Sequence, residues 1–358
     1  MGLFPVQVWR KAATLVLAAA AALFIAPALA EKPTGALARV EPIAVTAIAI
    51  DFDRDTPEQK TFGKLIWRGG LNLFAKSSSF GGYSALAVDA SGRTLLAISD
   101  AGSWFRANLD YDGRKLKGVS AASIGPILGG NGKPLADDRE RDAEGVALIS
   151  GSTAQGTVYV SFERDHRIER YPFTRDRFGP PDGGLRLPPE AKRMDANRGV
   201  EAIAPISAGK LRGTTVIFSE RLLDKGNLRG WLIGGPTPGP ILLKNMGFDI
   251  TDAAALPDGG IVLLERRFRY SEGVKMRIRR IGADALKPGA LIAGEVLLEA
   301  NDSYNIDNME GIAAHRSGTG ETILTLVSDD NFSPLQRTLL MQFAIAEGKP
   351  VLAAPRAD

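Results

Sequence analysis

The sequence has 358 residues, enough to bury a sizeable core, and closed β architectures of such length often form one domain. It contains no cysteine and only two histidines, which excludes disulfides, thiolate nucleophiles, zinc–thiolate sites and histidine-rich metal sites. The net charge of +3 falls to +1 without the first thirty residues, which hold two basic residues and no acidic one. This balance gives no support to nucleic-acid binding, which calls for a basic face.

The first thirty residues have the three parts of a secretory signal peptide. Arg10-Lys11 is the basic part, residues 12–27 are the apolar part, and Ala28-Leu29-Ala30 is a small-x-small cleavage site. A membrane-spanning helix needs about 20 apolar residues, and this run is shorter. We therefore expect Sec-type export, cleavage after Ala30 and a periplasmic or secreted protein, with no later membrane span.

Five places in the rest of the chain share one pattern. A segment rich in small and apolar residues is followed by a Gly/Ser/Asp turn and then by a β-rich segment that ends in a carboxylate. The first segments begin at intervals of 60, 57, 51 and 58 residues, at Ser84, Glu144, Glu201, Asp252 and Glu310. A period of this length with several short strands per repeat is typical of β-propeller blades.

Further strands complete the repeats. We expect a third strand at residues 104–109, 168–173, 276–281 and 339–345, and a fourth, outer strand at residues 64–73 and 294–300. Four strands per repeat fit a blade, and the 64–73 strand is expected to complete the blade that the C-terminal repeat begins. The sequence therefore predicts an all-β propeller of five or six four-stranded blades.

The domain organisation follows from the repeats. Residues 31–43 are predicted to be a flexible segment, and residues 44–358 a single propeller domain. Residues 137–142 and 180–197 are the other segments expected to form loops. The chain has no G-x-S-x-G, no P-loop and no G-x-G-x-x-G after a strand, so serine-hydrolase and nucleotide-binding functions have no support.

The recurring carboxylates are the main candidates for chemistry. The first two strands of a blade form an antiparallel hairpin, so the start of the first and the end of the second lie at the same end of the blade. One mouth of the propeller is therefore expected to gather Glu144 and Glu163, Glu201 and Glu220, Asp252 and Glu265, and Glu310 and Asp329. Calcium takes 6 to 8 oxygen ligands, so we predict a Ca²⁺ site formed by Glu144, Glu201, Asp252 and Glu310.

The residues at the ends of the second strands have two interpretations. They could form ion pairs that hold neighbouring blades together, or they could bind substrate. The first-strand carboxylates likewise have an alternative to metal binding, because a residue that recurs in every repeat can hold neighbouring blades together through backbone hydrogen bonds. Arginines that point into the channel would suit a phosphate or carboxylate group. The substrate-binding candidates are Arg164, Arg221, Arg266, Asp100, Glu163, Glu220, Glu265 and Asp329, with Arg267 beside them. His166 is expected to be a hydrogen-bonding loop residue, and His315 to lie at the other mouth.

These motifs resemble the phytase-like family described as having esterase-like activity. The resemblance extends from about residue 63 to residue 343 and rests on Gly81-Gly82-Tyr83-Ser84-Ala85-Leu86, Ser99-Asp100-Ala101-Gly102-Ser103-Trp104, Asp142-Ala143-Glu144-Gly145, Glu201-Ala202, Leu264-Glu265-Arg266-Arg267 and Asn308-Met309-Glu310-Gly311-Ile312. It implies an exported bacterial propeller that hydrolyses phosphoesters or esters, and carries no catalytic residue set. The Glu-Gly-Ile/Val start of a strand, at Glu144 and Glu310, is also similar to calcium-dependent lactonase propellers, where such a glutamate binds the metal.

Two functions remain open from the sequence. The first is a calcium-dependent hydrolase of small phosphoester or ester molecules, in which the metal polarises a substrate oxygen. The second is a non-catalytic periplasmic propeller whose mouth binds a ligand or a protein. Propellers host both kinds of function, so the fold does not decide between them. In either case we expect a monomer that binds no nucleic acid.

Overall fold

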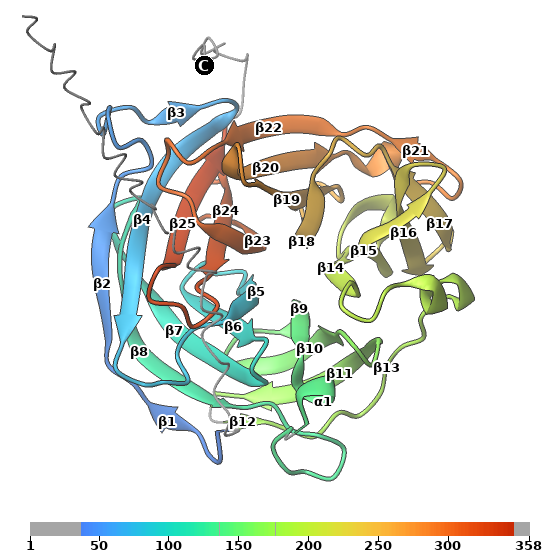
Figure 1. The fold of residues 1–358 in the computed structure, drawn as a ribbon, viewed down its shortest axis with the longest axis horizontal. Coiled ribbons are helices and arrows are strands. Elements are labelled where there is room, and N and C mark those ends of the chain that lie inside the picture. The colour runs from blue at the N-terminus through green and yellow to red at the C-terminus, as the bar shows by residue number, and fades with distance from the viewer. Residues whose placement is uncertain (1–36, 136, 176, 347–358) are drawn as a thin grey trace, which may run out of the picture.

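The protein is a five-bladed β-propeller. The computed structural model describes residues 37–135, 137–175 and 177–346; the predicted signal peptide and residues 31–36 of the predicted flexible segment lie outside them. Five sheets surround a central axis, and the inner strand of each points along that axis (Figure 1). The sequence predicts five or six blades, and the described residues form five.

Each of the first four blades is formed mainly by consecutive strands, which follow one another from the axis outward. The first has β5 (Tyr83–Val88), β6 (Thr94–Ser99), β7 (Ser103–Asp112), β8 (Lys115–Pro126) and β1 (Glu41–Pro42). The second has β9 (Ala143–Gly151), β10 (Gln155–Phe162), β11 (Arg167–Thr174) and β12 (Arg177–Phe178), with β13 (Gly184–Leu185) also on β11. The third has β14 (Val200–Pro205), β15 (Thr214–Asp224), β16 (Asn227–Gly234), β17 (Gly239–Leu243) and β21 (Leu291–Ile292). The fourth has β18 (Asp249–Ala255), β19 (Ile261–Arg269), β20 (Gly273–Ile281) and β22 (Glu295–Ala300).

The fifth blade joins the two ends of the chain, as the sequence predicts. Its inner strands are C-terminal, and its outer strands come from the N-terminal part: β23 (Asn308–Arg316), β24 (Thr322–Asp329), β25 (Thr338–Ile345), β4 (Leu65–Ala75) and β2 (Val45–Ile50), with β3 (Thr61–Phe62) also on β4. Strand β4 pairs with β25 from Leu65↔Ile345 to Leu73↔Thr338. This pairing closes the ring.

Three details of the predicted fold differ from the structure. The sheets have four to six strands rather than four throughout, because short strands such as β1, β13 and β21 add to the outer edges, where backbone groups are otherwise unpaired. Strand β1 lies inside the segment predicted to be flexible, where it pairs with β8. The predicted loops contain the one-turn helix α1 (Asp138–Arg141) and the 3₁₀-helix η1 (Pro189–Arg193).

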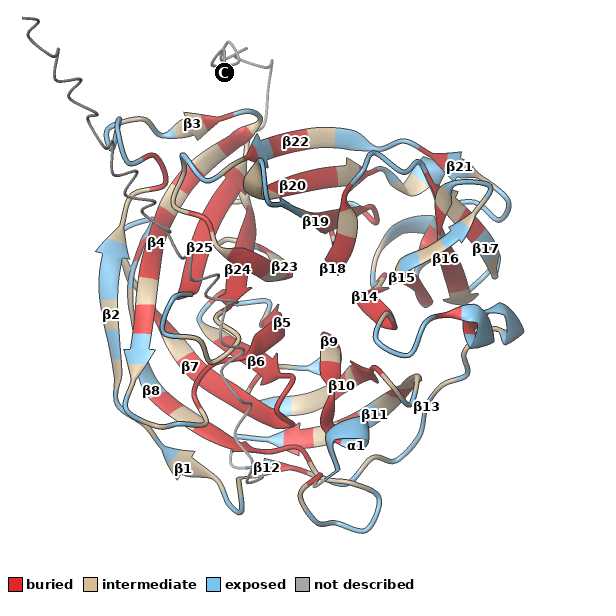
Figure 2. Ribbon diagram, in the orientation of Figure 1, coloured by how far each residue is buried: buried red, intermediate tan, exposed pale blue. Residues whose placement is uncertain are grey.

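The core lies between the blades, because neighbouring residues of a strand point to opposite faces of its sheet. In β19, Leu263 packs into the core shared with the third blade, and Leu264 into the core shared with the fifth. Full burial of such a side chain contributes about 1.5–3 kcal/mol. Figure 2 shows the consequence: the inner strands are almost wholly buried, and exposed residues gather on the outer strands and loops. A blade therefore depends on both of its neighbours for stability.

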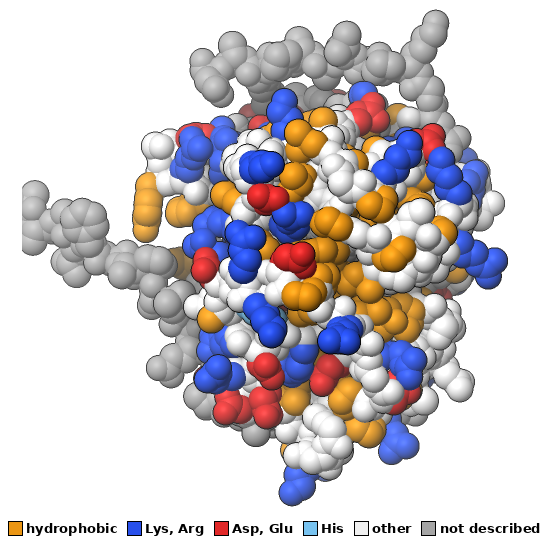
Figure 3. All heavy atoms as spheres, turned by 90° about the vertical axis from the view of Figure 1, so that its right-hand side faces the viewer, with side chains coloured by type: hydrophobic (Ala, Val, Ile, Leu, Met, Phe, Trp, Pro, Cys, Tyr) orange, Lys and Arg blue, Asp and Glu red, His pale blue; other side chains and the backbone are white. Residues whose placement is uncertain are grey.

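The outer surface is mixed in character. Figure 3 shows the side that carries the third blade, where basic and acidic side chains are interspersed with apolar ones. Among the described residues, no helix combines the length and the apolar composition needed to cross a membrane.

Candidate functional site

Every inner strand has a β-bulge near its first residue. The register between the first and second strands shifts there in all five blades, which leaves one inner-strand residue without a partner in the ladder. These bulge residues are Ser84, Glu144, Glu201, Thr251 and Glu310. A bulge re-aims the side chain of its extra residue, and three of these five side chains are glutamates.

A second set of residues lies in or just after the second strand, one position beyond the partner of the residue that precedes each bulge. The residue before each bulge pairs with Ser99, Phe162, Ser219, Glu265 or Ser328. The next residues in the chain are Asp100, Glu163, Glu220, Arg266 and Asp329. We name the seven carboxylates of the two sets, together with Arg266, the acidic mouth.

The fourth blade departs from the predicted alignment by one residue. Its bulge residue is Thr251, not Asp252, and its strand-end residue is Arg266, not Glu265. A shift of one residue turns a side chain to the opposite face of a strand. Asp252 is accordingly buried against the fifth blade, where its carboxylate accepts hydrogen bonds from the Ile312 amide at 2.8 Å and from the Ala253 amide at 2.7 Å. Asp252 therefore ties two blades together and is not part of the acidic mouth.

Glu265 also lies away from the acidic mouth. It forms a fully buried ion pair with Arg279, which in turn donates to the carbonyl of Lys244 in the segment that follows the third blade. The ion pair joins β19 and β20 within the fourth blade and is therefore not an interblade ion pair; the hydrogen bond from Arg279 to Lys244 links it to the third blade. Arg221 pairs with Asp249 across the third and fourth blades, and Arg164 pairs with Asp142 at 2.6 Å.

Two groups of carboxylates within and beside the acidic mouth have the spacing of metal ligands. Asp142, Glu144 and Glu163 each offer an oxygen within 4.8 Å of the others, and Glu163, Glu201 and Glu220 do the same. Oxygens that share a calcium ion at 2.3–2.6 Å lie at most about 5 Å apart. Both groups therefore fit a hard cation, and Glu163 belongs to both. Asp142 directly follows α1.

Burial and mutual repulsion raise the pKa values of several carboxyl groups of the acidic mouth. Burial raises the pKa of Glu201 well above its usual range, and the charges of Glu144, Glu163 and Glu220 add to this effect. Burial, followed by the charge of Asp249, raises the pKa of Glu220 to about 7. The pKa of Asp329 is raised in the same way, by burial and by the charges of Asp100 and Glu310. The site thus concentrates more negative charge than its own residues neutralise.

Arg266 is the cation of the acidic mouth. It lies 3.2 Å from Glu310 and also donates to the side-chain oxygen of Asn308. Burial lowers the pKa of Arg266, but the nearby charges of Glu310, Glu220, Glu201 and Asp329 raise it overall. These four carboxylates come from the third and fifth blades, so the charges around the axis form one interacting group.

The two histidines and the polar residues before Glu310 take part in other contacts or lie away from the acidic mouth. His166 makes a hydrogen bond of 3.0 Å with the Asp195 carbonyl, and His315 lies near the end of β23 that is distant from Glu310. Arg337 donates hydrogen bonds to the side-chain oxygens of Asp307 and Asn305, which precede Glu310 in the chain.

The opposite end of the axis is apolar. A cavity of about 350 Å³ is lined there by the far ends of all five inner strands, including Ala87, Ala147, Ala254 and Ala313. The two ends of the axis therefore differ sharply in polarity, and the carboxylates of the acidic mouth occur at one end.

The model of the Phytase-like family, described as "Esterase-like activity of phytase", matches residues 78–332, well over half of the chain. The chain belongs to the Phytase-like family. The matched residues include every member of the acidic mouth, which makes this site the natural candidate for the activity of a Phytase-like protein. No curated protein matches the chain.

Solved structures resemble this Phytase-like chain only distantly. A gluconolactonase from Xanthomonas campestris has 10% identity and a TM-score of 0.40, with 87% of this chain and 98% of the other covered. A protein of unknown function from Dyadobacter fermentans has 11% identity and a TM-score of 0.38, with 87% and 95% covered. A putative oxidoreductase (glucose dehydrogenase) from Thermus thermophilus has 12% identity and a TM-score of 0.32, with 84% and 99% covered. At these TM-scores, none of the likenesses supports a function for this chain.

Proposed function

We propose that the protein is a calcium-dependent hydrolase of small phosphoester or ester molecules, with its centre at the acidic mouth. The observation that carries the proposal is the pair of carboxylate groups that share Glu163 at the spacing of calcium ligands. Membership of a family described by esterase-like activity of phytase supports the reaction class.

The burial and spacing of the carboxylates suit a hard divalent cation. Glu163 and Glu201 are buried, and their oxygens lie close to those of Glu144 and Glu220. Like charges at such separations repel by roughly 1–4 kcal/mol per pair, and a cation would offset this repulsion. Asp142, Glu144, Glu163, Glu201 and Glu220 would hold the ion. A bound cation would polarise the substrate oxygen and lower the pKa of a water molecule.

Two further side chains of the acidic mouth have properties that the proposal uses. The pKa of Glu220 is about 7 in the protein without metal, so Glu220 gives up its proton when it holds the cation, and calcium is expected to bind more tightly as the pH rises through 7. Arg266 presents several N–H donors, and such a guanidinium binds phosphate or carboxylate oxygens in pairs. We assign Arg266 to orienting the anionic part of the substrate beside the carboxylates.

A substrate screen tests the proposal. The mature protein is incubated with a phosphomonoester, phytate, a carboxylic ester and a lactone, in calcium and in chelator. We expect calcium-dependent hydrolysis of at least one substrate, and a loss of about 100-fold or more in kcat/KM for Glu163→Gln. Glu58→Gln, at an exposed glutamate outside the site, is the matched control and is expected to keep full activity.

The same assay can overturn the proposal. If no substrate is hydrolysed while calcium binds and Glu163→Gln abolishes that binding, the acidic mouth is a binding site of the non-catalytic kind. If hydrolysis occurs but is indifferent to chelator and to Glu163→Gln, the reaction takes place elsewhere.

We also propose that the chain acts outside the cytoplasm. The three-part sequence of residues 1–30 supports this placement. Mass spectrometry of the exported protein is expected to find Glu31 at the N-terminus, and an exported chain that begins at Met1 would contradict it.

A further inference from the structure

A second polar cavity lies on the opposite side of the molecule from the acidic mouth. It has a volume of about 560 Å³ and lies between the first and fifth blades, at the turns β5–β6, β7–β8 and β23–β24. Binding sites for small molecules have volumes of about 300–1,000 Å³. The acidic mouth uses the other end of the same strands, so the cavity is separate from the proposed hydrolytic centre.

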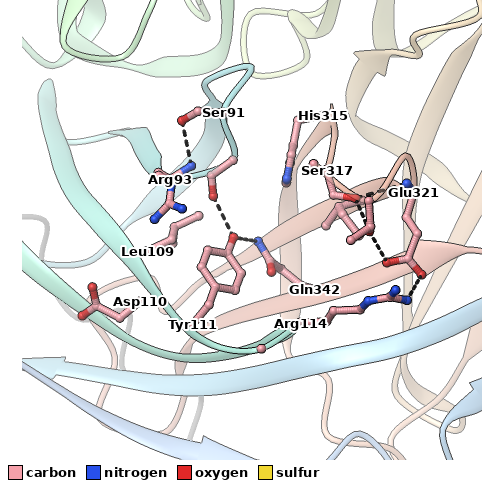
Figure 4. Close-up of a pocket in the computed structure, with 15 residues that line it drawn as sticks. Ser91, Arg93, Leu109, Asp110, Tyr111, Arg114, His315, Ser317, Glu321 and Gln342 are labelled. Atoms are coloured by element: carbon pink, nitrogen blue, oxygen red, sulfur yellow. Dashed lines mark hydrogen bonds and ion pairs between the residues drawn. The ribbon is translucent and has the colours of Figure 1, made fainter.

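Hydrogen bonds fix the side chains of the cavity floor, and one of them joins the two blades. The Tyr111 hydroxyl donates to the Gly92 carbonyl at 2.8 Å, and the Gln342 side-chain amide donates to the Tyr111 oxygen and to the Thr325 hydroxyl, each at 3.0 Å. Figure 4 shows Tyr111 and Gln342 side by side below His315. A site whose side chains are already fixed loses little entropy when a ligand binds.

His315 supplies an unused polar group to this cavity. Its side chain is buried, with 7% of the residue exposed, and its Nδ1 has no hydrogen-bond partner among the described residues. Burial lowers the pKa of His315, so the ring is neutral at neutral pH and offers one donor and one acceptor.

The rim of the cavity combines hydroxyl groups with a cation. Ser317 and Thr319 form a hydrogen-bonded turn, 2.9 Å between their hydroxyl oxygens, beside Glu321. Glu321 is neutralised by ion pairs with Arg68 and Arg114. Across the described part of the chain, the guanidinium of Arg93 is in no ion pair, and it lines the same cavity. Arg93 therefore offers its positive charge to a ligand.

We propose that this cavity binds a small polyhydroxylated molecule that carries one anionic group, such as a sugar phosphate or a sugar acid. Arg93 binds the phosphate or carboxylate oxygens, and His315, Ser317 and Thr319 bind hydroxyl groups. Leu109 and Ile323 provide the apolar surface for the C–H face of the ligand. An apolar ligand would leave Arg93 and His315 without partners, which disfavours it.

Calorimetry with four probes tests the proposal, in chelator so that hydrolysis at the acidic mouth does not contribute. The probes are glucose 6-phosphate, glucuronate, glucose and inorganic phosphate. We expect saturable 1:1 binding of at least one anionic sugar, at least about tenfold tighter than glucose or phosphate, because a charge-assisted hydrogen bond adds to the hydroxyl contacts. The bound sugar is also expected to raise the melting temperature, since it joins the first and fifth blades.

Two variants locate the binding. A Cβ added at Gly318 meets open space, so Gly318→Trp is expected to fold, to fill the cavity and to abolish binding, whereas its matched control Gly318→Ala keeps it. Arg93→Gln is expected to weaken the anionic sugar about tenfold, to the affinity of glucose, whereas the same change at the exposed Arg212 of the third blade has no effect.

The results distinguish a failure of this sugar-binding proposal from a failure of the proposed hydrolase function. It is wrong if neither anionic sugar binds, if glucose or phosphate alone binds as tightly, or if Gly318→Trp and Arg93→Gln bind normally. Hydrolysis at the acidic mouth is expected to be unchanged in Gly318→Trp, and its absence in every variant would count only against the proposed function.

Discussion

The protonation state of each carboxyl group determines how much negative charge the acidic mouth carries. The acidic mouth holds seven carboxylates and one arginine, and the charges of these groups act on one another across the axis. Arg198, outside the two sets, approaches Glu220 at 3.9 Å. Protons or a cation must offset this charge. Glu220 is the informative residue because its pKa of about 7 lies within the experimental pH range.

The raised pKa of Glu220 predicts how the stability of the metal-free protein depends on pH. Its stabilising contribution is present below pH ~4.5 and is lost as pH rises through about 7, because the folded state holds the proton more tightly than the unfolded chain. The full shift corresponds to about 3 kcal/mol. We therefore expect Glu220→Gln to be more stable than the wild type at pH 8 by up to about 3 kcal/mol, and nearly equal to it at pH 4.5.

Urea unfolding in chelator at both pH values measures this difference. Glu58→Gln serves as the control and is expected to follow the wild type at both. An equal gap between Glu220→Gln and the wild type at the two pH values would show that Glu220 does not titrate as proposed.

At the scale of the strand, the β-bulges decide which residues reach the acidic mouth. The sequence correctly predicts the strands, the hairpin ends and the closure by the 64–73 strand, because these follow from alternation and from the repeat. It misplaces Asp252 and Glu265, because composition does not show where a bulge inserts its extra residue. With Thr251 and Arg266 aligned instead, the fourth blade follows the register of the others.

The bulge register explains why glycine or alanine follows the bulge in the other blades. The residue after the bulge is Ala85, Gly145, Ala202 or Gly311. A Cβ on Gly311 would lie 2.9 Å from the Cα of Ala85 in the first blade, and one on Gly145 would lie 2.8 Å from the Glu201 carbonyl in the third. This position therefore contacts the next blade, and the size pattern is a sequence signal that could have separated Asp252 from the glutamates.

The alignment expected from the sequence makes Asp252 a metal ligand, whereas the observed alignment makes it a contact between blades. The two alignments make opposite predictions for Asp252→Ala. We expect this variant to lose about 1–3 kcal/mol of stability, because the buried Ile312 amide loses its acceptor, and to keep the calcium response of the wild type. Glu201→Gln is expected to do the reverse, weakening the response without a comparable loss of stability in chelator. Denaturant titrations with and without calcium provide both quantities. A calcium response that disappears in Asp252→Ala would restore Asp252 to the ligand set.

At the scale of the molecule, a cation at the acidic mouth would join separate blades. Glu163 belongs to the second blade, and Glu201 and Glu220 to the third. An ion that binds only the closed ring stabilises it by about 2.7 kcal/mol at one hundred times its dissociation constant. We expect calcium to raise the melting temperature, chelator to reverse this, and Glu163→Gln to remove most of the response. An unchanged melting temperature in all conditions would argue against a metal at this site.

Closure by β4 predicts that the ring cannot form without the N-terminal strands. A chain that starts at residue 77 lacks β1 to β4, which leaves the edge of β25 unpaired and removes Leu65, Trp67 and Leu71 from the core. We expect it to aggregate and to show no cooperative thermal transition, whereas a chain that starts at residue 37 melts like the mature protein. Size-exclusion chromatography and calorimetry distinguish the two. A monomeric, cooperatively melting chain from residue 77 would show that the fifth blade is complete without β4.

The fourth blade makes the acidic mouth asymmetric about the propeller axis. Five identical blades would offer an incoming molecule five equivalent orientations about the axis. With Thr251 and Arg266 in place of two carboxylates, a positive group in the fourth blade faces the carboxylate groups of the second and third blades. A molecule with a cationic and an anionic end would then have one preferred rotation about the axis, and the same part of it would meet the same side chains at each encounter.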